Sequence, residues 1–173
     1  MKTFICEICG DAYIGLEKPK NCPFCGAREN FIKPGSEAKP IVNEKIDLSE
    51  QSIKNLKATY DLEIRAVAIY TCMAGKAKSY EIKAMYKRLA KVEMEHAVIV
   101  TKLLQTERPV IGEESCDDED IENFKKTIVL EENAANLYKQ FMQEAEEQNI
   151  KILFTALSQA EEDHIELIKN YLK

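Results

Sequence analysis

Apolar residues recur at three- and four-residue intervals from residue 48 to the end of the chain, which is the period of an amphipathic helix. This part contains a single proline, Pro109, and few glycines, so little in it would break a helix. Asp47 or Ser49 can cap the first helix, and the stretch from Arg108 to Gly112 ends the second. The pattern predicts four helices, at about 49–75, 79–106, 118–147 and 150–172.

The predicted helices form two copies of one pattern, related by a shift of 68 residues. Without any gap, fifteen identical pairs coincide among the 53 pairs from Ile53/Ile121 to Gln105/Lys173. Chance would give about three or four at ordinary residue frequencies. The helical part is therefore a doubled helical hairpin, at about 49–106 and 118–172. Among the shared pairs are Glu63/Glu131, Tyr70/Tyr138, Glu93/Glu161 and His96/His164.

Four carboxylates and both histidines of the chain lie within the apolar stripes of these helices, and not on the polar faces. The first helix of each hairpin contributes a glutamate. The second contributes a Glu-x-x-His, whose two side chains share one helix face. Glutamates on ordinary surface helices are the alternative, but they give no reason for both motifs to repeat at one offset. The six residues are Glu63, Glu93, His96, Glu131, Glu161 and His164.

Buried carboxylates repel one another and are costly unless they are paired or bind metal. Two histidines can offset two negative charges at most, whereas two divalent cations balance all four. A Glu from each of two helices and a Glu-x-x-His from each of the other two form the di-iron or di-manganese arrangement of four-helix bundles. Tyr70 and Tyr138 each follow a first-helix glutamate by seven residues, so they either hydrogen-bond carboxylates or fill the core.

Four cysteines in the first 25 residues form two Cys-x-x-Cys motifs, Cys6/Cys9 and Cys22/Cys25. Two such turns that face each other supply four thiolates at tetrahedral corners, which suits zinc or a single iron. A pair of disulfides is one alternative, although disulfides are rare in the cytoplasm, and a purely structural zinc ribbon is another. Prolines, a glycine and charges at 33–40 then mark a boundary. We expect a metal-binding domain at 1–35, a linker at 36–47 and the bundle at 48–173.

Composition and charge exclude several classes of function. The chain has 173 residues and a net charge of −6, which disfavours nucleic acid as a partner because phosphate binding needs a basic face. No apolar run approaches the ~20 residues that cross a bilayer, and the N-terminus lacks the apolar core of a signal peptide. We therefore expect no membrane partner and a cytoplasmic location. The predicted fold class is mainly α.

These motifs resemble the rubrerythrin family along nearly the whole chain. The cysteine motifs are similar to a rubredoxin-type iron centre, and the doubled hairpin is similar to a ferritin-like di-iron bundle. Rubrerythrins usually carry the rubredoxin part last, so its N-terminal position resembles the reverse rubrerythrins. The resemblance implies roles for ten residues: bridging carboxylates Glu93 and Glu161, terminal carboxylates Glu63 and Glu131, nitrogen ligands His96 and His164, and electron-transfer iron ligands Cys6, Cys9, Cys22 and Cys25.

The activity that the resemblance implies is reduction of hydrogen peroxide to water, which protects anaerobic or microaerophilic cells. Electrons would pass from a reductase through the rubredoxin-like iron to two non-haem irons. Dioxygen is the alternative oxidant, manganese the alternative metal in the bundle and zinc the alternative at the cysteines. Family members carry a further ligand glutamate on the third helix, where this chain has Ala134, so the site resembles the symmetric six-ligand type. A ferroxidase or iron-handling bundle, or a zinc-ribbon interaction module, are the alternative functions.

The connection between the two hairpins is short for the distance that it must span. Residues 107–118 must cover roughly 35 Å, close to the ~40 Å that twelve residues reach when extended. We therefore expect a homodimer, with exchange of the second hairpins between chains as one form of it. Cys72 is expected to be a small helical filler. Cys116 is expected to have no redox role, because the carboxylates beside it disfavour the thiolate.

Overall fold

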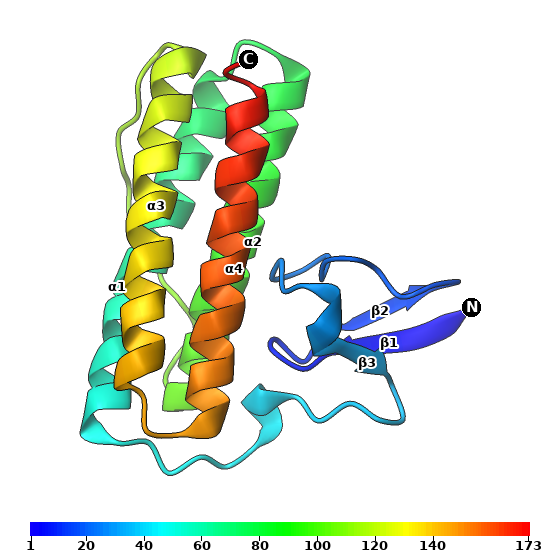
Figure 1. Ribbon diagram of the computed structural model, residues 1–173. Coiled ribbons are helices and arrows are strands. Elements are labelled where there is room, and N and C mark those ends of the chain that lie inside the picture. The colour runs from blue at the N-terminus through cyan, green and yellow to red at the C-terminus, as the bar shows by residue number, and fades with distance from the viewer.

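The computed structural model describes residues 1–173 and contains a small β-sheet region followed by a bundle of four long helices (Figure 1). The first two helices pack on each other, as do the last two, which gives the two hairpins. The predicted fold class is confirmed, and the helix ends differ from their predicted positions by at most three residues. The helices are α1 (Glu50–Lys76), α2 (Tyr80–Leu104), α3 (Asp120–Glu144) and α4 (Gln148–Asn170).

Local hydrogen bonds explain where the helices of the first hairpin begin and end. The Ser49 hydroxyl accepts a hydrogen bond from the Ser52 N–H, so Ser49 caps α1 and Asp47 does not. Ser79 caps α2 in the same way. Helix α2 ends at Leu104, two residues before its predicted end at 106, and the next residue, Gln105, adopts the left-handed conformation with φ of 54°.

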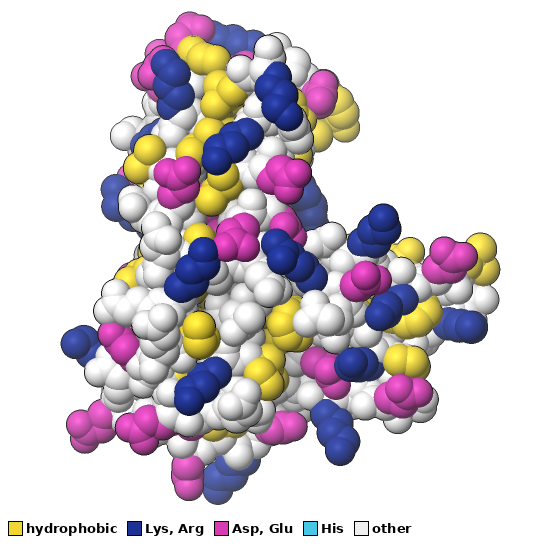
Figure 2. All heavy atoms as spheres, viewed as in Figure 1, with side chains coloured by type: hydrophobic (Ala, Val, Ile, Leu, Met, Phe, Trp, Pro, Cys, Tyr) yellow, Lys and Arg dark blue, Asp and Glu magenta, His cyan; other side chains and the backbone are white.

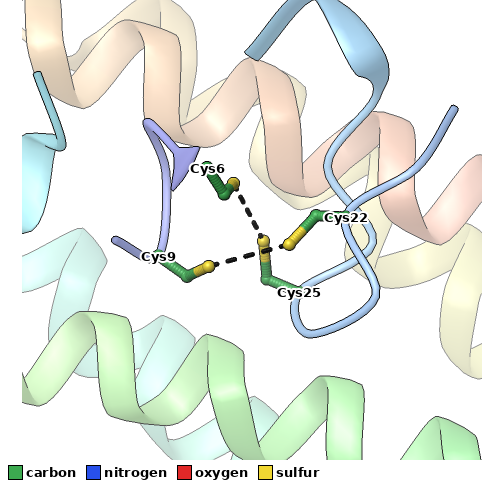
Figure 3. Close-up of side chains that lie close together, drawn as sticks. All are labelled: Cys6, Cys9, Cys22 and Cys25. Atoms are coloured by element: carbon green, nitrogen blue, oxygen red, sulfur yellow. Dashed lines mark hydrogen bonds between the residues drawn. The ribbon is translucent and has the colours of Figure 1, made fainter. Parts of the chain in front are cut away.

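The N-terminal part, here called the cysteine region (residues 1–35), is built on a three-stranded antiparallel sheet. Its strands are β1 (Lys2–Cys6), β2 (Ala12–Gly15) and β3 (Ile32–Pro34), in the order β2-β1-β3. The four cysteine side chains point toward one another between the two turns that carry them (Figure 3). The short 3-10 helices Glu29–Phe31 and Ile41–Asn43 precede β3 and follow it, and the chain then enters α1.

The apolar core has two clusters, one on each side of the buried carboxylates. One cluster joins the cysteine region to the half of the bundle in which α1 and α4 begin, and it includes Ile8, Leu56 and Phe154. The other cluster fills the half of the bundle in which α1 and α4 end, and it includes Tyr86 and Ile168. Charged side chains of both signs are interspersed over the face shown in Figure 2, where the cysteine region projects from the side of the bundle. No helix combines the length and the apolar character needed to span a membrane.

The crossover between the hairpins runs along α1. The Val110 N–H donates to the Tyr60 hydroxyl, Arg65 pairs with Glu114 at 2.8 Å, and Lys76 donates to the Cys116 carbonyl at 2.9 Å. Both hairpins of one chain therefore form one bundle, and the crossover is long enough to close it without exchange between chains. A homodimer, with or without such exchange, stays a prediction.

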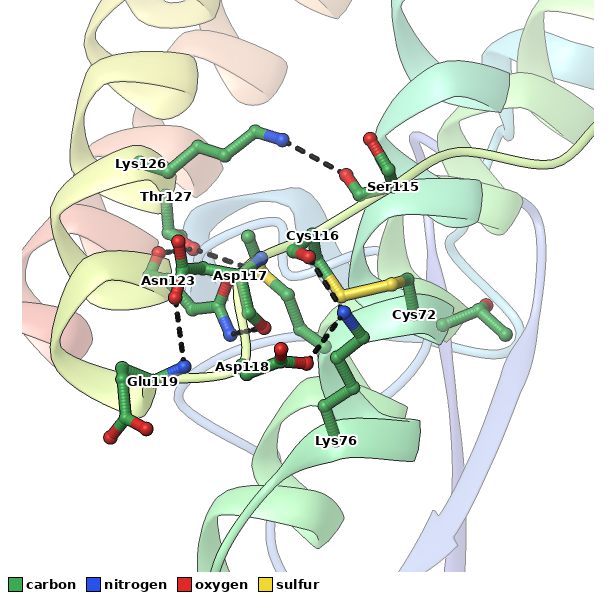
Figure 4. The surroundings of a disulfide bond; sticks show 12 residues. Cys72, Lys76, Ser115, Cys116, Asp117, Asp118, Glu119, Asn123, Lys126 and Thr127 are labelled. Atoms are coloured by element: carbon green, nitrogen blue, oxygen red, sulfur yellow. Dashed lines mark hydrogen bonds and ion pairs between the residues drawn. A yellow bond between two sulfur atoms is a disulfide. The ribbon is translucent and has the colours of Figure 1, made fainter.

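The structure corrects the predictions for Cys72 and Cys116. The two residues form a disulfide that ties the crossover to α1 (Figure 4). Cys72 is therefore not only a helical filler, and Cys116 takes part in thiol oxidation. The acidic neighbours of Cys116 led to the wrong prediction because Lys76, which comes from α1, pairs with Asp118 at 2.8 Å and offsets their charge.

Candidate metal centres

The four helices bring the six predicted carboxylate and histidine residues into one buried cluster. Each lies on the inward face of its helix, and the exposed fraction of the residue is 7% for His164 and at most 3% for the others. Potential ligand atoms fall into two groups whose members all lie within 4.8 Å of one another. The first group is Glu63, Glu93, His96 and Glu161, and the second is Glu93, Glu131, Glu161 and His164.

The two groups share Glu93 and Glu161 and are related by the internal repeat. His96 Nδ1 lies 3.0 Å from a Glu93 oxygen and 3.4 Å from a Glu161 oxygen. His164 Nδ1 lies 2.9 Å from Glu161 and 3.2 Å from Glu93. Each unshared carboxylate, on α1 or α3, is 3.4 Å from one histidine only. This is the geometry of two adjacent sites with two common carboxylates.

Six atoms of this cluster are buried without a hydrogen-bond partner, although buried polar atoms are normally hydrogen-bonded. Both oxygens of Glu93 and Glu161 and the Nδ1 atoms of His96 and His164 are in this position. Two shared carboxylates and two imidazoles would present these same atoms to a pair of metal ions. The donor set therefore fits a di-iron type of site, in which two divalent cations balance the four carboxylates.

The charges within the cluster perturb one another strongly. Burial raises the pKa of the Glu63 carboxyl to about 8 and raises the pKa of Glu131 well above its usual value. Burial opposes charge on His96 and His164, yet the adjacent carboxylates raise the pKa of both imidazoles well above the usual value. For Glu161 the burial penalty is outweighed by its contacts with the two histidines, so its pKa is lowered. A cation that binds here therefore replaces protons.

Two buried tyrosines hold the unshared carboxylates, and each bond crosses from one hairpin to the other. Tyr70 on α1 donates a hydrogen bond to Glu131 on α3 at 2.6 Å. Tyr138 on α3 donates in the same way to Glu63 on α1. Of the two roles left open from the sequence, the structure therefore shows both, because each ring also lies in the core.

The four cysteines of the N-terminal region form a second candidate site. Their Sγ atoms lie within 4.8 Å of one another, with Cys6 and Cys25 at 3.7 Å and Cys9 and Cys22 at 3.8 Å (Figure 3). A tetrahedral metal with sulfur bonds of about 2.3 Å separates its ligands by about 3.8 Å. All four thiols are buried and free, so the alternative of two disulfides is wrong for these residues. The site fits a rubredoxin-type metal.

The cysteine region contacts the bundle at the carboxylate cluster. His96 Nε2 lies 2.8 Å from the carbonyl oxygen of Cys25, while Nδ1 of the same ring faces the carboxylates. Gly26, with φ of +75°, allows this approach, because a Cβ there would lie 3.3 Å from Ala160 of α4. Arg28 adds a two-pronged ion pair with Asp163, at 2.8 and 3.2 Å. One imidazole therefore joins the two candidate sites within a single chain.

Sequence reasoning identified the residues that the structure brings together in the two clusters but missed this connection. No local signal could have found it, because Cys25 and His96 are 71 residues apart and lie in the cysteine region and the first hairpin, respectively. Ala134 is buried on α3 and lines a cavity beside Glu131.

Comparisons with known proteins agree with this architecture. Residues 54–119 match the rubrerythrin family model. The chain is 34% identical over 113 residues to reverse rubrerythrin-1 of Clostridium acetobutylicum, a match that covers 60% of this chain and 62% of the relative. No solved structure matches the chain significantly. With its cysteine region ahead of a doubled helical hairpin, this chain is similar to the rubrerythrin family and to a relative that is named a reverse rubrerythrin.

Proposed function

We propose that the chain is a non-haem di-iron peroxidase that reduces hydrogen peroxide, and as a second oxidant dioxygen, to water. Electrons would come from a reductase and enter through the four-cysteine site. The ligands we assign to the two irons are the six residues of the buried cluster, with Glu93 and Glu161 shared, and those of the single metal are Cys6, Cys9, Cys22 and Cys25.

The observation that carries the proposal is the contact between His96 and the Cys25 carbonyl. A cysteine site that served only to fold its own region would not need to reach a buried imidazole of the bundle. A ferroxidase takes its electrons from the Fe(II) that it oxidises, so it also has no use for such a connection. An enzyme that must be re-reduced after each turnover does need it.

The chemistry divides between the metals and the protein. When bound, a pair of irons can supply two electrons to one O–O bond, and a four-thiolate iron can return them singly with little change in geometry. The protein keeps the cluster buried, which limits the escape of reactive species. Tyr70 and Tyr138 hold the unshared carboxylates in place, and their phenolic protons stay bound because burial raises the pKa of both hydroxyls.

The test is a comparison of single-turnover oxidation and steady-state turnover in Cys9→Ser. The variant disrupts the cysteine site but leaves the bundle ligands intact. We expect peroxide to oxidise its reduced di-iron site at the normal rate, whereas turnover with a reductase stops. Cys72→Ser is the matched control, because it replaces a cysteine that lies outside both metal sites and is bonded to Cys116, so its turnover should continue. Full turnover by Cys9→Ser would refute the proposed electron route.

The metal identity and the alternative interaction module are tested together by spectroscopy. Anaerobic stopped-flow mixing of the reduced protein with peroxide, and separately with oxygen, should show a visible band from the cysteine site that changes with its redox state. A colourless protein would indicate zinc at the cysteines and would favour the zinc-ribbon interaction module.

A further inference from the structure

A cavity of about 400 Å³ lies between α1 and α3 and reaches the carboxylate cluster, and we call it the α1–α3 cavity. Three of its lining residues, Glu63, Glu131 and Glu161, are buried members of the cluster. Others, including Arg65 and Asn133, are exposed. Because one lining contains both kinds of residue, the cavity connects the surface with the cluster.

The wall between these two ends is largely apolar. Leu62 and Ile69 of α1 and Leu130 of α3 contribute to it, together with two alanines. The alanines are Ala66 and Ala134, which occupy equivalent positions in the internal repeat. Two small side chains therefore line one cavity, one from each hairpin. Because both are alanines, they leave room in the cavity that a larger side chain would fill.

A second cavity on the side of the cysteine region does not offer the same approach. It has a volume of about 460 Å³ and touches the cluster at His164 alone, among polar residues such as Asn21 and Asp163. On that side the Cys25 carbonyl already contacts the other imidazole. The α1–α3 cavity reaches three carboxylates, and it does so opposite the point where the cysteine region docks.

We propose that the α1–α3 cavity binds organic hydroperoxides, so that alkyl hydroperoxides are substrates of this site in addition to hydrogen peroxide. This inference rests on the peroxidase function proposed above and names a substrate class for it. The O–O bond of ROOH breaks, the substrate gains two electrons from the proposed donor and two protons from solvent, and the products are ROH and water. The organic group R would lie against the apolar wall.

Volume and charge both support this class of ligand. A water molecule takes up about 30 Å³ in the liquid, so the cavity offers far more room than hydrogen peroxide needs. Its volume lies within the ~300–1,000 Å³ range of cavities that bind organic ligands. Hydroperoxides are neutral at pH 7, so the buried carboxylates at the inner end do not repel them.

The first test measures oxidation of the chemically reduced holoprotein by tert-butyl hydroperoxide and by hydrogen peroxide in anaerobic single-turnover mixing. Ala134→Leu fills the cavity, and we expect it to lower the ratio of the tert-butyl rate to the hydrogen peroxide rate at least tenfold. Asn136→Leu is the matched control, because Asn136 is exposed on the same helix and does not line the cavity. Ala66→Leu approaches from α1 and replaces Ala134→Leu if the latter does not fold.

The second test measures binding without turnover. Cobalt(II) replaces the native metal in the full chain, and the visible absorption of the cobalt follows titration with acetate or with pivalate. These two carboxylates share a head group and differ by three methyl groups. We expect the wild type to bind pivalate at least as tightly as acetate, and Ala134→Leu to lose pivalate binding at least tenfold relative to acetate.

The outcomes separate this inference from the peroxidase proposal. If neither hydrogen peroxide nor tert-butyl hydroperoxide oxidises the reduced wild type, the peroxidase proposal fails and this inference fails with it. If hydrogen peroxide reacts but tert-butyl hydroperoxide does not, the substrate class is wrong while the peroxidase stands. If both react and the rate ratio and the pivalate affinity are the same in Ala134→Leu and Asn136→Leu, the cavity is not the binding site.

Discussion

Tyr70 of α1 donates a hydrogen bond to Glu131 of α3 at 2.6 Å, so a tyrosine of the first hairpin holds a carboxylate of the second. The repeat supplies the reciprocal bond from Tyr138 to Glu63. Direct packing between α1 and α3 is slight compared with packing within each hairpin. These two buried bonds therefore help to keep the halves of the cluster in register.

Removal of the Tyr70 hydroxyl should destabilise the protein. Tyr70→Phe leaves the ring in the core but deprives buried Glu131 of its donor, which should lower the free energy of unfolding of the metal-free chain by about 1–3 kcal/mol. Urea denaturation measures this change. Tyr80→Phe, at a site that is 86% exposed, should have no effect. Equal unfolding midpoints for the two variants would contradict the role assigned to Tyr70.

The metal-free protein should lose stability as the pH rises from about 5 to about 8. In the unfolded chain Glu63 ionises near pH 4.5, whereas burial raises its pKa in the folded chain to about 8. The folded state therefore holds a proton that the unfolded state releases, and rising pH favours unfolding. The raised pKa values of His96 and His164 act in the same direction.

Glu63→Gln isolates this effect because glutamine cannot ionise. Its free energy of unfolding should fall less steeply over the same range, by up to about 1.4 kcal/mol per pH unit relative to the wild type. Urea titrations at several pH values compare the two proteins after metal removal. Parallel pH profiles would show that Glu63 does not titrate as expected.

A side chain at Gly26 should slow electron delivery. A Cβ at this position lies 3.3 Å from Ala160, so Gly26→Ala should push the Cys25 carbonyl away from His96 and slow re-reduction of the di-iron site at least threefold. Gly10→Ala is the control, because Gly10 has a similar φ of +84° but a Cβ there meets Val42, not the bundle helices. Both glycines have a positive φ, so alanine strains the backbone at either position. Equal re-reduction rates would argue against the contact as the route.

Reduction of the Cys72–Cys116 disulfide should loosen the crossover. The bond closes a loop across 44 residues, and such a loop corresponds to about 2–4 kcal/mol of stability. Added thiol should therefore lower the unfolding midpoint of the wild type and increase hydrogen exchange at residues 107–119. Cys72→Ser should already be destabilised and should not respond to thiol. If added thiol leaves the unfolding midpoint of the wild type unchanged, the disulfide does not form in solution.

Much of the candidate site was readable from the sequence because each signal is local and periodic. The apolar spacing predicted the helices, and the 68-residue shift showed that Glu93 and His96 have counterparts at Glu161 and His164. Carboxylates within apolar stripes implied burial, and burial implied a cation. The spacing of the cysteines in the two Cys-x-x-Cys motifs was enough to predict the four-cysteine site. The ligand roles of these residues stay predictions that the variants above test.

The sequence by itself determined which residues face inward, since helix period and side-chain charge act within one element. Only the tertiary structure decided which elements meet: that the Cys25 carbonyl reaches His96 of the same chain, that Cys72 bonds to Cys116, and that two alanines line one cavity. Each of these contacts joins segments far apart along the chain. Their positions depend on how whole helices and the cysteine region pack, and no local pattern encodes that packing.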